Sequence, residues 1–149
     1  MKILMVCLGN ICRSPLAEGI MKNLLTKEPK LRWKIDSAGT ASYHVGSQPD
    51  KRSVAEAEKH GIDLTTIRSR QLSNMDFYTH DIILAMDAEN YNNIIKIQPS
   101  DSHARVELIM NYAFPKENRQ VPDPYYEGGF DEVYNMLEHA CTAFIKMNS

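Results

Sequence analysis

Apolar residues occur along this chain in short unbroken runs that alternate with segments of helical periodicity. The unbroken runs predict strands covered on both faces, because such strands lack a polar side. We predict four strands in all, over residues 2–6, 33–37, 81–86 and 105–109. Apolar positions at helical spacing predict helices over residues 14–26, 51–60, 88–97 and 130–146. The stretches 40–50 and 110–129, which contain several Gly and Pro residues, are expected to be loops.

This alternation of strands and helices predicts an α/β fold, a three-layer sandwich around a four-stranded parallel sheet. No break in composition divides residues 1–149, so we expect a single domain. Ser14 is expected to cap the first helix, with Pro15 at its first position. In parallel sheets, ligands bind beyond the carboxyl ends of strands and beside helix N-termini. The junction over residues 6–15 is such a place.

Composition narrows the classes of function. The 149 residues are 43% hydrophobic and 24% charged, with a formal net charge of -2. No basic excess suggests nucleic acid or an anionic membrane as the main partner. The apolar run at the N-terminus is too short for a signal peptide, and no run approaches the length of a membrane span. We therefore expect a cytoplasmic protein.

Three cysteines, Cys7, Cys12 and Cys141, are present. Their number is odd and the chain is too large for a disulfide scaffold, so reduced thiols are expected. No Cys/His pairing has the spacing of a zinc site, so we expect no metal.

The first strand runs directly into a candidate phosphate site, with the sequence Cys-Leu-Gly-Asn-Ile-Cys-Arg-Ser-Pro. Phosphoryl transfer to sulfur needs a thiolate, donors for the phosphate oxygens and a fixed positive charge. Cys7 can supply the thiolate, and Arg13 offers a planar fork that keeps its charge. The intervening backbone N–H groups can form an anion nest at a helix N-terminus.

Three further residues of this loop have expected roles. Gly9 is expected to take a backbone conformation closed to other residues. Asn10 is expected to stabilise the loop through its amide or a left-handed turn. Ser14 is placed to hydrogen-bond the Cys7 sulfur. Cys-x5-Arg alone occurs by chance, and a buried cysteine beside a capping serine is the plain structural interpretation. The buried strand before it and the Ser-Pro helix start after it favour the functional one.

A general acid for the leaving oxygen is the remaining requirement, and Asp123 is the candidate. Pro122 and Pro124 flank it and stiffen its loop, while Tyr125 and Tyr126 offer aromatic faces to a ring-bearing substrate. Alone, an Asp beside proline is typical of an ordinary turn. Together with the cysteine loop it completes a phosphatase site.

The chain resembles the low-molecular-weight protein tyrosine phosphatases over essentially its whole length, with a nucleophile near the N-terminus and an Asp-Pro acid near the C-terminus. The matching segments are residues 6–15, 35–39, 70–71, 83–87 and 123–125. The resemblance implies the phosphatase I-like fold and a protein-tyrosine-phosphatase activity without metal or organic cofactor. The substrate would be a phosphotyrosine protein or an aryl phosphate, with inorganic phosphate as product. The protein would be a monomer with weak self-association at most.

The resemblance also implies residue roles. Cys7 would form a phosphocysteine, Arg13 would hold the phosphoryl group, and Asp123 would protonate the departing phenol and then activate water. The substrate-binding set would be Leu8, Gly9, Asn10, Ile11, Cys12, Ser14, Tyr43, Tyr125 and Tyr126. Ser37 and Asp87 would support the loop. Cys12 would either trap an oxidised Cys7 as a disulfide or simply fill the loop.

Two positions depart from the family pattern. Many members carry a His that joins the loop network where this chain has Ile67, and some carry Trp where this chain has Tyr43. The first departure leaves open what replaces the imidazole. The second bears on substrate preference and not on the chemistry.

Three other functions fit parts of this sequence pattern. Phosphoarginine phosphatases resemble this loop but typically have Thr in place of Ile11, whose bulky aliphatic side chain favours an aromatic ring. A thiol-linked arsenate reductase needs two further cysteines, and Cys141 alone does not supply them. A phosphate-binding module without turnover would bind phosphate but release no product.

Overall fold

A computed structural model describes residues 1–149 and has a sheet of four parallel strands in the order β2-β1-β3-β4. The strands are β1 (Lys2–Cys7), β2 (Lys34–Gly39), β3 (Ile82–Ala85) and β4 (Arg105–Leu108). The helices are α1 (Arg13–Leu25), α2 (Lys51–Glu58), α3 (Asp76–Thr79), α4 (Ala88–Ile97), α5 (Pro124–Glu127) and α6 (Phe130–Asn148), with a 3-10 turn at Ile109–Asn111. The predicted four-stranded parallel α/β fold is confirmed.

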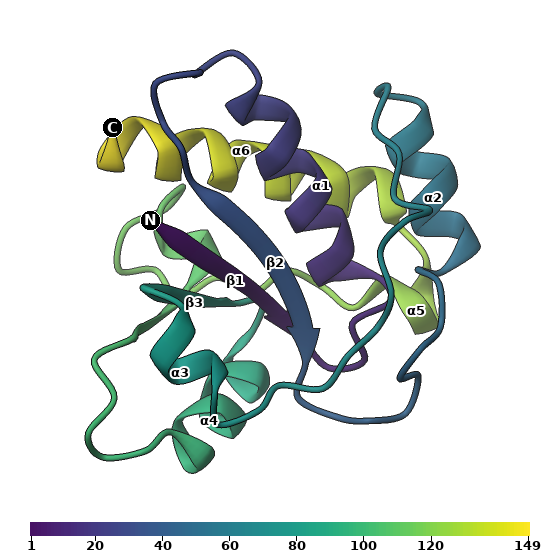
Figure 1. The fold of residues 1–149 in the computed structure, drawn as a ribbon. Coiled ribbons are helices and arrows are strands. Elements are labelled where there is room, and N and C mark those ends of the chain that lie inside the picture. Colours follow the sequence, from purple (N-terminus) through teal and green to yellow (C-terminus); the bar gives the residue numbers. More distant parts are fainter.

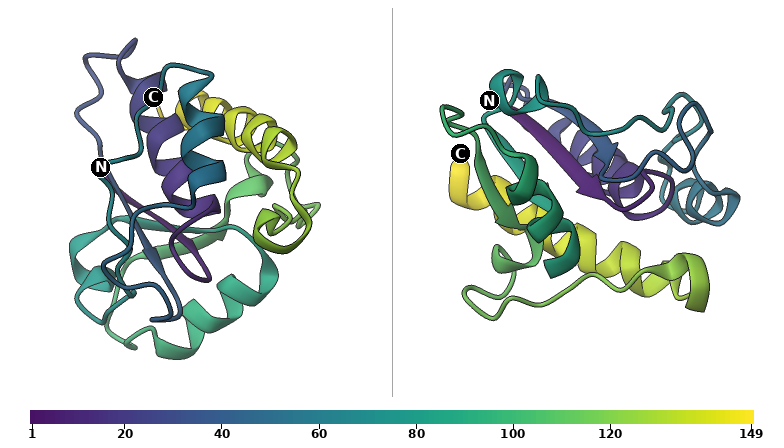
Figure 2. Two further views of the ribbon diagram at one scale, coloured as in Figure 1. Left: turned by 90° about the vertical axis from the view of Figure 1, so that its right-hand side faces the viewer. Right: turned by 90° about the horizontal axis from the view of Figure 1, so that it is seen from below.

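The helices form two layers around the sheet. Helices α1, α2 and α6 lie together on one side, while α3 and α4 lie on the other (Figure 1). Figure 2 shows both chain termini near one end of the sheet, away from the loop that follows β1. The carboxyl ends of the strands are therefore free to carry a site.

Strand β1 explains why an unbroken apolar run was present in the sequence. Ile3 and Met5 belong to the core between the sheet and α1 and α6, whereas Leu4 and Val6 belong to the core on the opposite face. All four are fully buried. A central strand with helices on both faces has no side that water reaches.

Three local predictions were wrong. Helix α1 begins at Arg13, with Cys12 and not Ser14 at the N-cap position, because the Ser14 hydroxyl makes a tertiary hydrogen bond instead. Strand β2 runs two residues beyond the predicted end, since Gly39 pairs with Cys7 of β1. The short helices α3 and α5 were missed because a single turn shows no periodicity.

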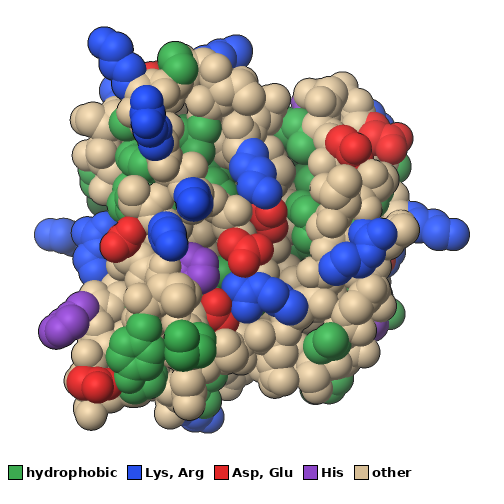
Figure 3. Space-filling model, in the orientation of Figure 1, with side chains coloured by type: hydrophobic (Ala, Val, Ile, Leu, Met, Phe, Trp, Pro, Cys, Tyr) green, Lys and Arg blue, Asp and Glu red, His purple; other side chains and the backbone are tan.

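The surface carries mixed charge on the side seen in Figure 3, where acidic side chains lie between several of the Lys and Arg side chains. None of the helices combines the length and the apolar composition that crossing a bilayer requires.

Candidate active site

The loop from Leu8 to Cys12 joins β1 to α1 at the carboxyl edge of the sheet. Asn10 has a left-handed backbone conformation, with φ of 56°, as one of the two expectations for it stated. Gly9 does not adopt such a conformation, which corrects the prediction. Its missing side chain instead leaves room for a neighbour, because a Cβ at Gly9 would lie 3.0 Å from Cδ2 of His44.

A pocket opens above this loop and gathers most of the predicted site. Its lining residues are Cys7, Leu8, Gly9, Ile11, Cys12, Arg13, Tyr43, His44, Asp123, Tyr125 and Tyr126. His44 was not predicted, since a histidine in a Ser- and Gly-containing loop carries no signal of its own. Asn10 and Ser14, which were placed in the substrate-binding set, do not line the pocket; both are fully buried.

Asn10 and Ser14 lie behind the loop in a hydrogen-bond network that ends on the cysteine. Ser14 Oγ lies 3.0 Å from Cys7 Sγ, and the Asn10 amide donates to Ser14 Oγ at 2.8 Å and to Ser37 Oγ at 3.0 Å. The side-chain Oδ1 of Asn10 accepts from the backbone N–H of Arg70. Because Asn10 donates to Ser14, the Ser14 hydroxyl can in turn donate to the Cys7 sulfur at 3.0 Å or to the carbonyl oxygen of Ala38 at 3.5 Å.

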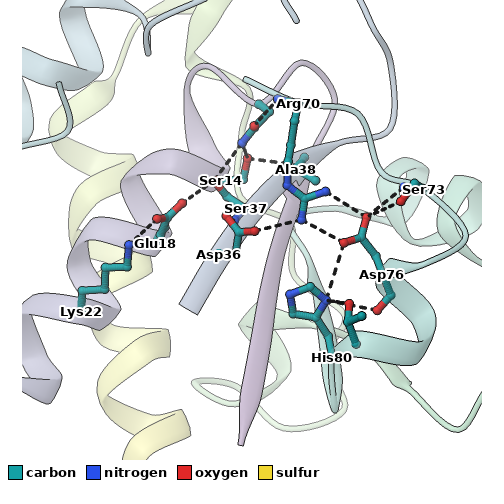
Figure 4. A network of polar contacts seen from close by, with 12 residues as sticks. Ser14, Glu18, Lys22, Asp36, Ser37, Ala38, Arg70, Ser73, Asp76 and His80 are labelled. Atoms are coloured by element: carbon teal, nitrogen blue, oxygen red, sulfur yellow. Dashed lines mark hydrogen bonds and ion pairs between the residues drawn. The ribbon is translucent and has the colours of Figure 1, made fainter. Parts of the chain in front are cut away.

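The network continues to Glu18, a residue that the sequence analysis missed. Ser37 Oγ donates to Glu18 Oε1 at 2.6 Å, and Lys22 Nζ donates to Glu18 Oε2 at 2.6 Å (Figure 4). Glu18 is 4% exposed, and a carboxylate buried so deeply needs such partners. The spacing of Glu18 and Lys22 on α1 is typical of a helical ion pair, but it gives no sign of the contact with Ser37.

Ile67 contributes no polar group to this network. Its half-buried side chain packs against the main hydrophobic core. The segment after it supports the loop through polar contacts, because Ser69 Oγ donates to the carbonyl oxygen of Gly9 at 2.9 Å. Arg70 is in turn held by Asp36 and Asp76 (Figure 4).

Arg13 is almost completely buried, with 2% exposure. Its Nη1 donates to Asp87 Oδ2 at 2.6 Å and to the carbonyl oxygen of Val121 at 3.0 Å. Asp87 also caps α4 by accepting from the Asn90 backbone N–H, so its carboxylate is fixed at both oxygens. Burial opposes the charge on Arg13, but Cys7 and Asp87 outweigh it and raise the guanidinium pKa above its ordinary value. Arg13 is thus a permanent cation at the pocket floor.

Asp123 approaches the same pocket from the other side. It caps α5 by accepting from the Tyr125 backbone N–H at 3.1 Å, and Pro124 occupies the first helical position. Its Oδ2 lies 3.6 Å from Nη2 of Arg13, and its side chain is 31% exposed. The structure therefore brings together a cysteine thiol, a cation and a partly exposed carboxyl group, which are the kinds of group that phosphoryl transfer with protonation of a leaving group requires.

Cys12 differs from Cys7 in its surroundings. Burial, with Asp50 and Cys7 nearby, raises the pKa of the Cys12 thiol to about 12. Its carbonyl oxygen accepts from Ser53 Oγ at 3.3 Å. Cys12 therefore rests as a thiol at neutral pH, although both sulfurs belong to residues that line the pocket.

Gly39 leaves the loop no room for a side chain. A Cβ there would lie 2.7 Å from the Leu8 carbonyl oxygen and 3.0 Å from the Gly9 carbonyl carbon, and backbone atoms do not move cheaply. Gly39→Ala is expected to displace the loop, lower the free energy of unfolding by about 1–3 kcal/mol and slow alkylation of Cys7. Urea unfolding and iodoacetamide labelling measure the two effects. Native values for both would contradict this prediction.

Comparisons with known proteins agree with this geometry. A family model described as low molecular weight phosphotyrosine protein phosphatase matches residues 2–148. A Synechocystis protein whose name assigns it to the low molecular weight protein-tyrosine-phosphatases is 49% identical over 146 residues, which are 95% of this chain and 92% of that protein.

Solved structures extend the similarity to the whole fold. A Drosophila arginine phosphatase matches with a TM-score of 0.92 and 35% identity, covering 100% of this chain and 98% of that one. A protein tyrosine phosphatase from Entamoeba histolytica matches with a TM-score of 0.91 and 38% identity, covering 99% and 96%.

Proposed function

The chain belongs to the low molecular weight phosphotyrosine protein phosphatase family, and on this premise we propose that it hydrolyses phosphotyrosine in proteins through a phosphocysteine on Cys7. As a family member it is a hydrolase of phosphoric monoesters. The observation that carries the proposed mechanism is the convergence of Cys7, Arg13 and Asp123 on one pocket, with Ser14 at 3.0 Å from the sulfur.

In the first step the Cys7 thiolate attacks phosphorus, so that a P–S bond forms and the P–O bond to the tyrosine ring breaks. Asp123, protonated at this stage, gives its proton to the departing phenolate oxygen. The loop N–H groups and Arg13 hold the three non-bridging oxygens. Nη2 of Arg13 makes no hydrogen bond within the protein, whereas Nη1 is occupied by Asp87 and Val121, so Nη2 is available to phosphate.

In the second step a water molecule attacks phosphorus, and the Asp123 carboxylate takes its proton. The P–S bond breaks, inorganic phosphate leaves, and the sulfur departs as a thiolate that accepts from the Ser14 hydroxyl. We propose that Tyr43, Tyr125 and Tyr126 at the pocket mouth contact the substrate ring and its flanking residues. Tyr43 and Tyr126 are 74% and 77% exposed, which supports contact with a partner protein.

We further propose that the chain acts as one domain and a monomer in the cytoplasm. All three cysteines are free in the structure, and a reducing compartment would keep the nucleophile in that state.

Phosphoarginine is the second candidate substrate, and the similarity to a Drosophila arginine phosphatase favours testing it. Ile11 is 8% exposed and packs with Cys12 and Phe130 at the pocket wall. Its aliphatic side chain suits an aromatic ring better than a polar guanidinium. We therefore expect the native chain to prefer a phosphotyrosine peptide over a matched phosphoarginine peptide in kcat/KM.

Ile11→Thr is expected to shift this ratio toward phosphoarginine by about tenfold, the usual effect of one changed apolar contact in a pocket. Steady-state assays on the two peptides, without added metal, measure it. A native preference for phosphoarginine would replace the tyrosine assignment. If the protein bound inorganic phosphate but hydrolysed neither peptide, it would be a phosphate-binding module and not an enzyme.

A further inference from the structure

The segment that carries Asp123 has few attachments to the rest of the protein. Within residues 122–128, one hydrogen bond leaves the segment: Arg52 Nη2 donates to the Tyr125 carbonyl oxygen at 3.2 Å. The other two hydrogen bonds are internal, from the Tyr125 N–H to Asp123 and from the Gly128 N–H to Pro124. The ion pair between Asp123 and Arg13, at 3.6 Å, is too long for a hydrogen bond. On the N-terminal side of the segment, Val121 is held by Met86 and Arg13 through its backbone N–H and carbonyl groups. On the C-terminal side of Asp123, Arg52 supplies the hydrogen bond that ties the segment to the rest of the protein.

Arg52 is itself held in one orientation. Its Nε and Nη2 each lie 3.0 Å from a different carboxylate oxygen of Asp50. The guanidinium carbon lies 4.8 Å from the centroid of the Phe130 ring and 5.7 Å from that of Tyr125. A guanidinium group that pairs with a carboxylate through two hydrogen bonds and stacks on an aromatic ring is well ordered even at a half-exposed site.

The first turn of α2 is also bonded to the loop that carries the nucleophile. The Asp50 backbone N–H donates to the Ile11 carbonyl oxygen at 2.8 Å, and Ser53 Oγ donates to the Cys12 carbonyl oxygen at 3.3 Å. Ser53 is fully buried. The start of α2 therefore contacts the nucleophile loop through Asp50 and Ser53, and the acid segment through Arg52.

We propose that Arg52 is a positioning residue for the general acid, and that it fixes Asp123 relative to Cys7 by tying the Tyr125 carbonyl to α2. The inference rests on the proposed function, since it assigns how the acid of that mechanism is held. Arg52 does not line the pocket and is not expected to touch substrate.

This role has a distinctive kinetic signature. A leaving group of high pKa needs protonation as the P–O bond breaks, whereas nitrophenolate leaves with little help. Exposed ion pairs add little to folding stability, so loss of Arg52 is expected to impair acid catalysis and not folding. Removal of Arg52 should therefore slow poor leaving groups selectively.

The experiment measures kcat/KM of Arg52→Ala for p-nitrophenyl phosphate and phenyl phosphate. We expect phenyl phosphate to lose about tenfold more than p-nitrophenyl phosphate, a fraction of what a general acid contributes in full. Arg52→Gln, which keeps the alkyl stem, should show the same selective loss of kcat/KM for phenyl phosphate as Arg52→Ala. In an Asp123→Ala background, Arg52→Ala should cause no further loss, because the acid it positions is absent.

Arg119→Ala is the matched control. Arg119 is equally exposed, at 50%, and also pairs with a carboxylate and stacks on a ring, those of Glu117 and Phe114, but does not contact residues 122–128. It should leave the ratio of the two substrates unchanged. The rate of Cys7 alkylation should be native in Arg52→Ala, because Asp50 and Ser53 still hold the nucleophile loop.

Equal losses on both substrates, a further loss in the Asp123→Ala background, or slowed alkylation of Cys7 would overturn the role of Arg52. Such results would leave the proposed function standing, since the native chain would still hydrolyse both substrates. Absence of turnover by the native chain would overturn the function and, with it, the role of Arg52.

Discussion

Replacing Cys7 with serine is expected to abolish hydrolysis, with a loss on the order of a millionfold, as for other enzymes that lose their nucleophile. A serine hydroxyl is a much weaker acid and a poorer nucleophile than a cysteine thiol, so no covalent intermediate forms. Acid-quenched mass spectrometry of native protein during turnover should find phosphate on Cys7. The serine variant should carry none.

The serine variant also separates catalysis from binding. The smaller hydroxyl fits in the space of the thiol, and the Arg13 side chain remains in place, so binding of inorganic phosphate should survive. Calorimetry can measure that binding, and thermal unfolding can confirm the fold. Substantial turnover by Cys7→Ser, or a phosphorylated residue other than Cys7 in the native protein, would exclude the thiolate mechanism.

Arg13→Lys is expected to lower kcat/KM on the order of 10²–10³-fold, similar to the loss of one preorganised donor to a transition-state oxygen. Lysine keeps the charge, but one ammonium group does not satisfy Asp87 and the Val121 carbonyl while also offering a fork to phosphate. The free energy of unfolding should also fall, because Asp87 would lose part of its buried partner. Steady-state kinetics and urea unfolding measure the two effects.

Arg68→Lys is the matched control for this change. The Arg68 guanidinium donates to the carbonyl oxygens of Thr65 and Ile67 at the exposed surface. It contacts no residue of the pocket, and its replacement should leave kcat/KM native. Activity of Arg13→Lys within a few-fold of the native value would mean that charge alone, without the planar fork, suffices in this pocket.

The strand pattern was predictable because a strand that is buried on both faces consists of consecutive apolar residues, which can be seen directly in the sequence. Strand β1 could be identified from four consecutive apolar residues, and the structure covers it on both faces. The catalytic candidates on the first loop were also within reach, since Cys7, Arg13 and Ser14 are close in sequence. Asp123 could be named because prolines mark its loop.

Residues that act through contacts between distant segments were not predictable. Glu18 reaches the network through Ser37, and Arg52 reaches the acid segment through Tyr125, a separation of 73 residues. Each is, by itself, an ordinary charged residue on a helix. The expectation that Ser14 caps α1 failed for a related reason, because the Cys7 sulfur, seven residues earlier, engages its hydroxyl.

The sequence by itself determined the alternation of elements and the parallel sheet, and it supplied Cys7, Arg13 and Asp123 as the candidate nucleophile, phosphate-binding arginine and acid. These features depend on the composition of short segments and on the spacing between residues that are close in the chain, and both can be seen in the sequence. Only the tertiary structure decided that Asn10 and Ser14 lie behind the pocket, that Glu18 joins the network through Ser37, and that Arg52 bonds the Tyr125 carbonyl to α2. Such roles depend on which side chains meet across the fold, and hydrogen bonds between distant segments leave no periodic trace in the chain.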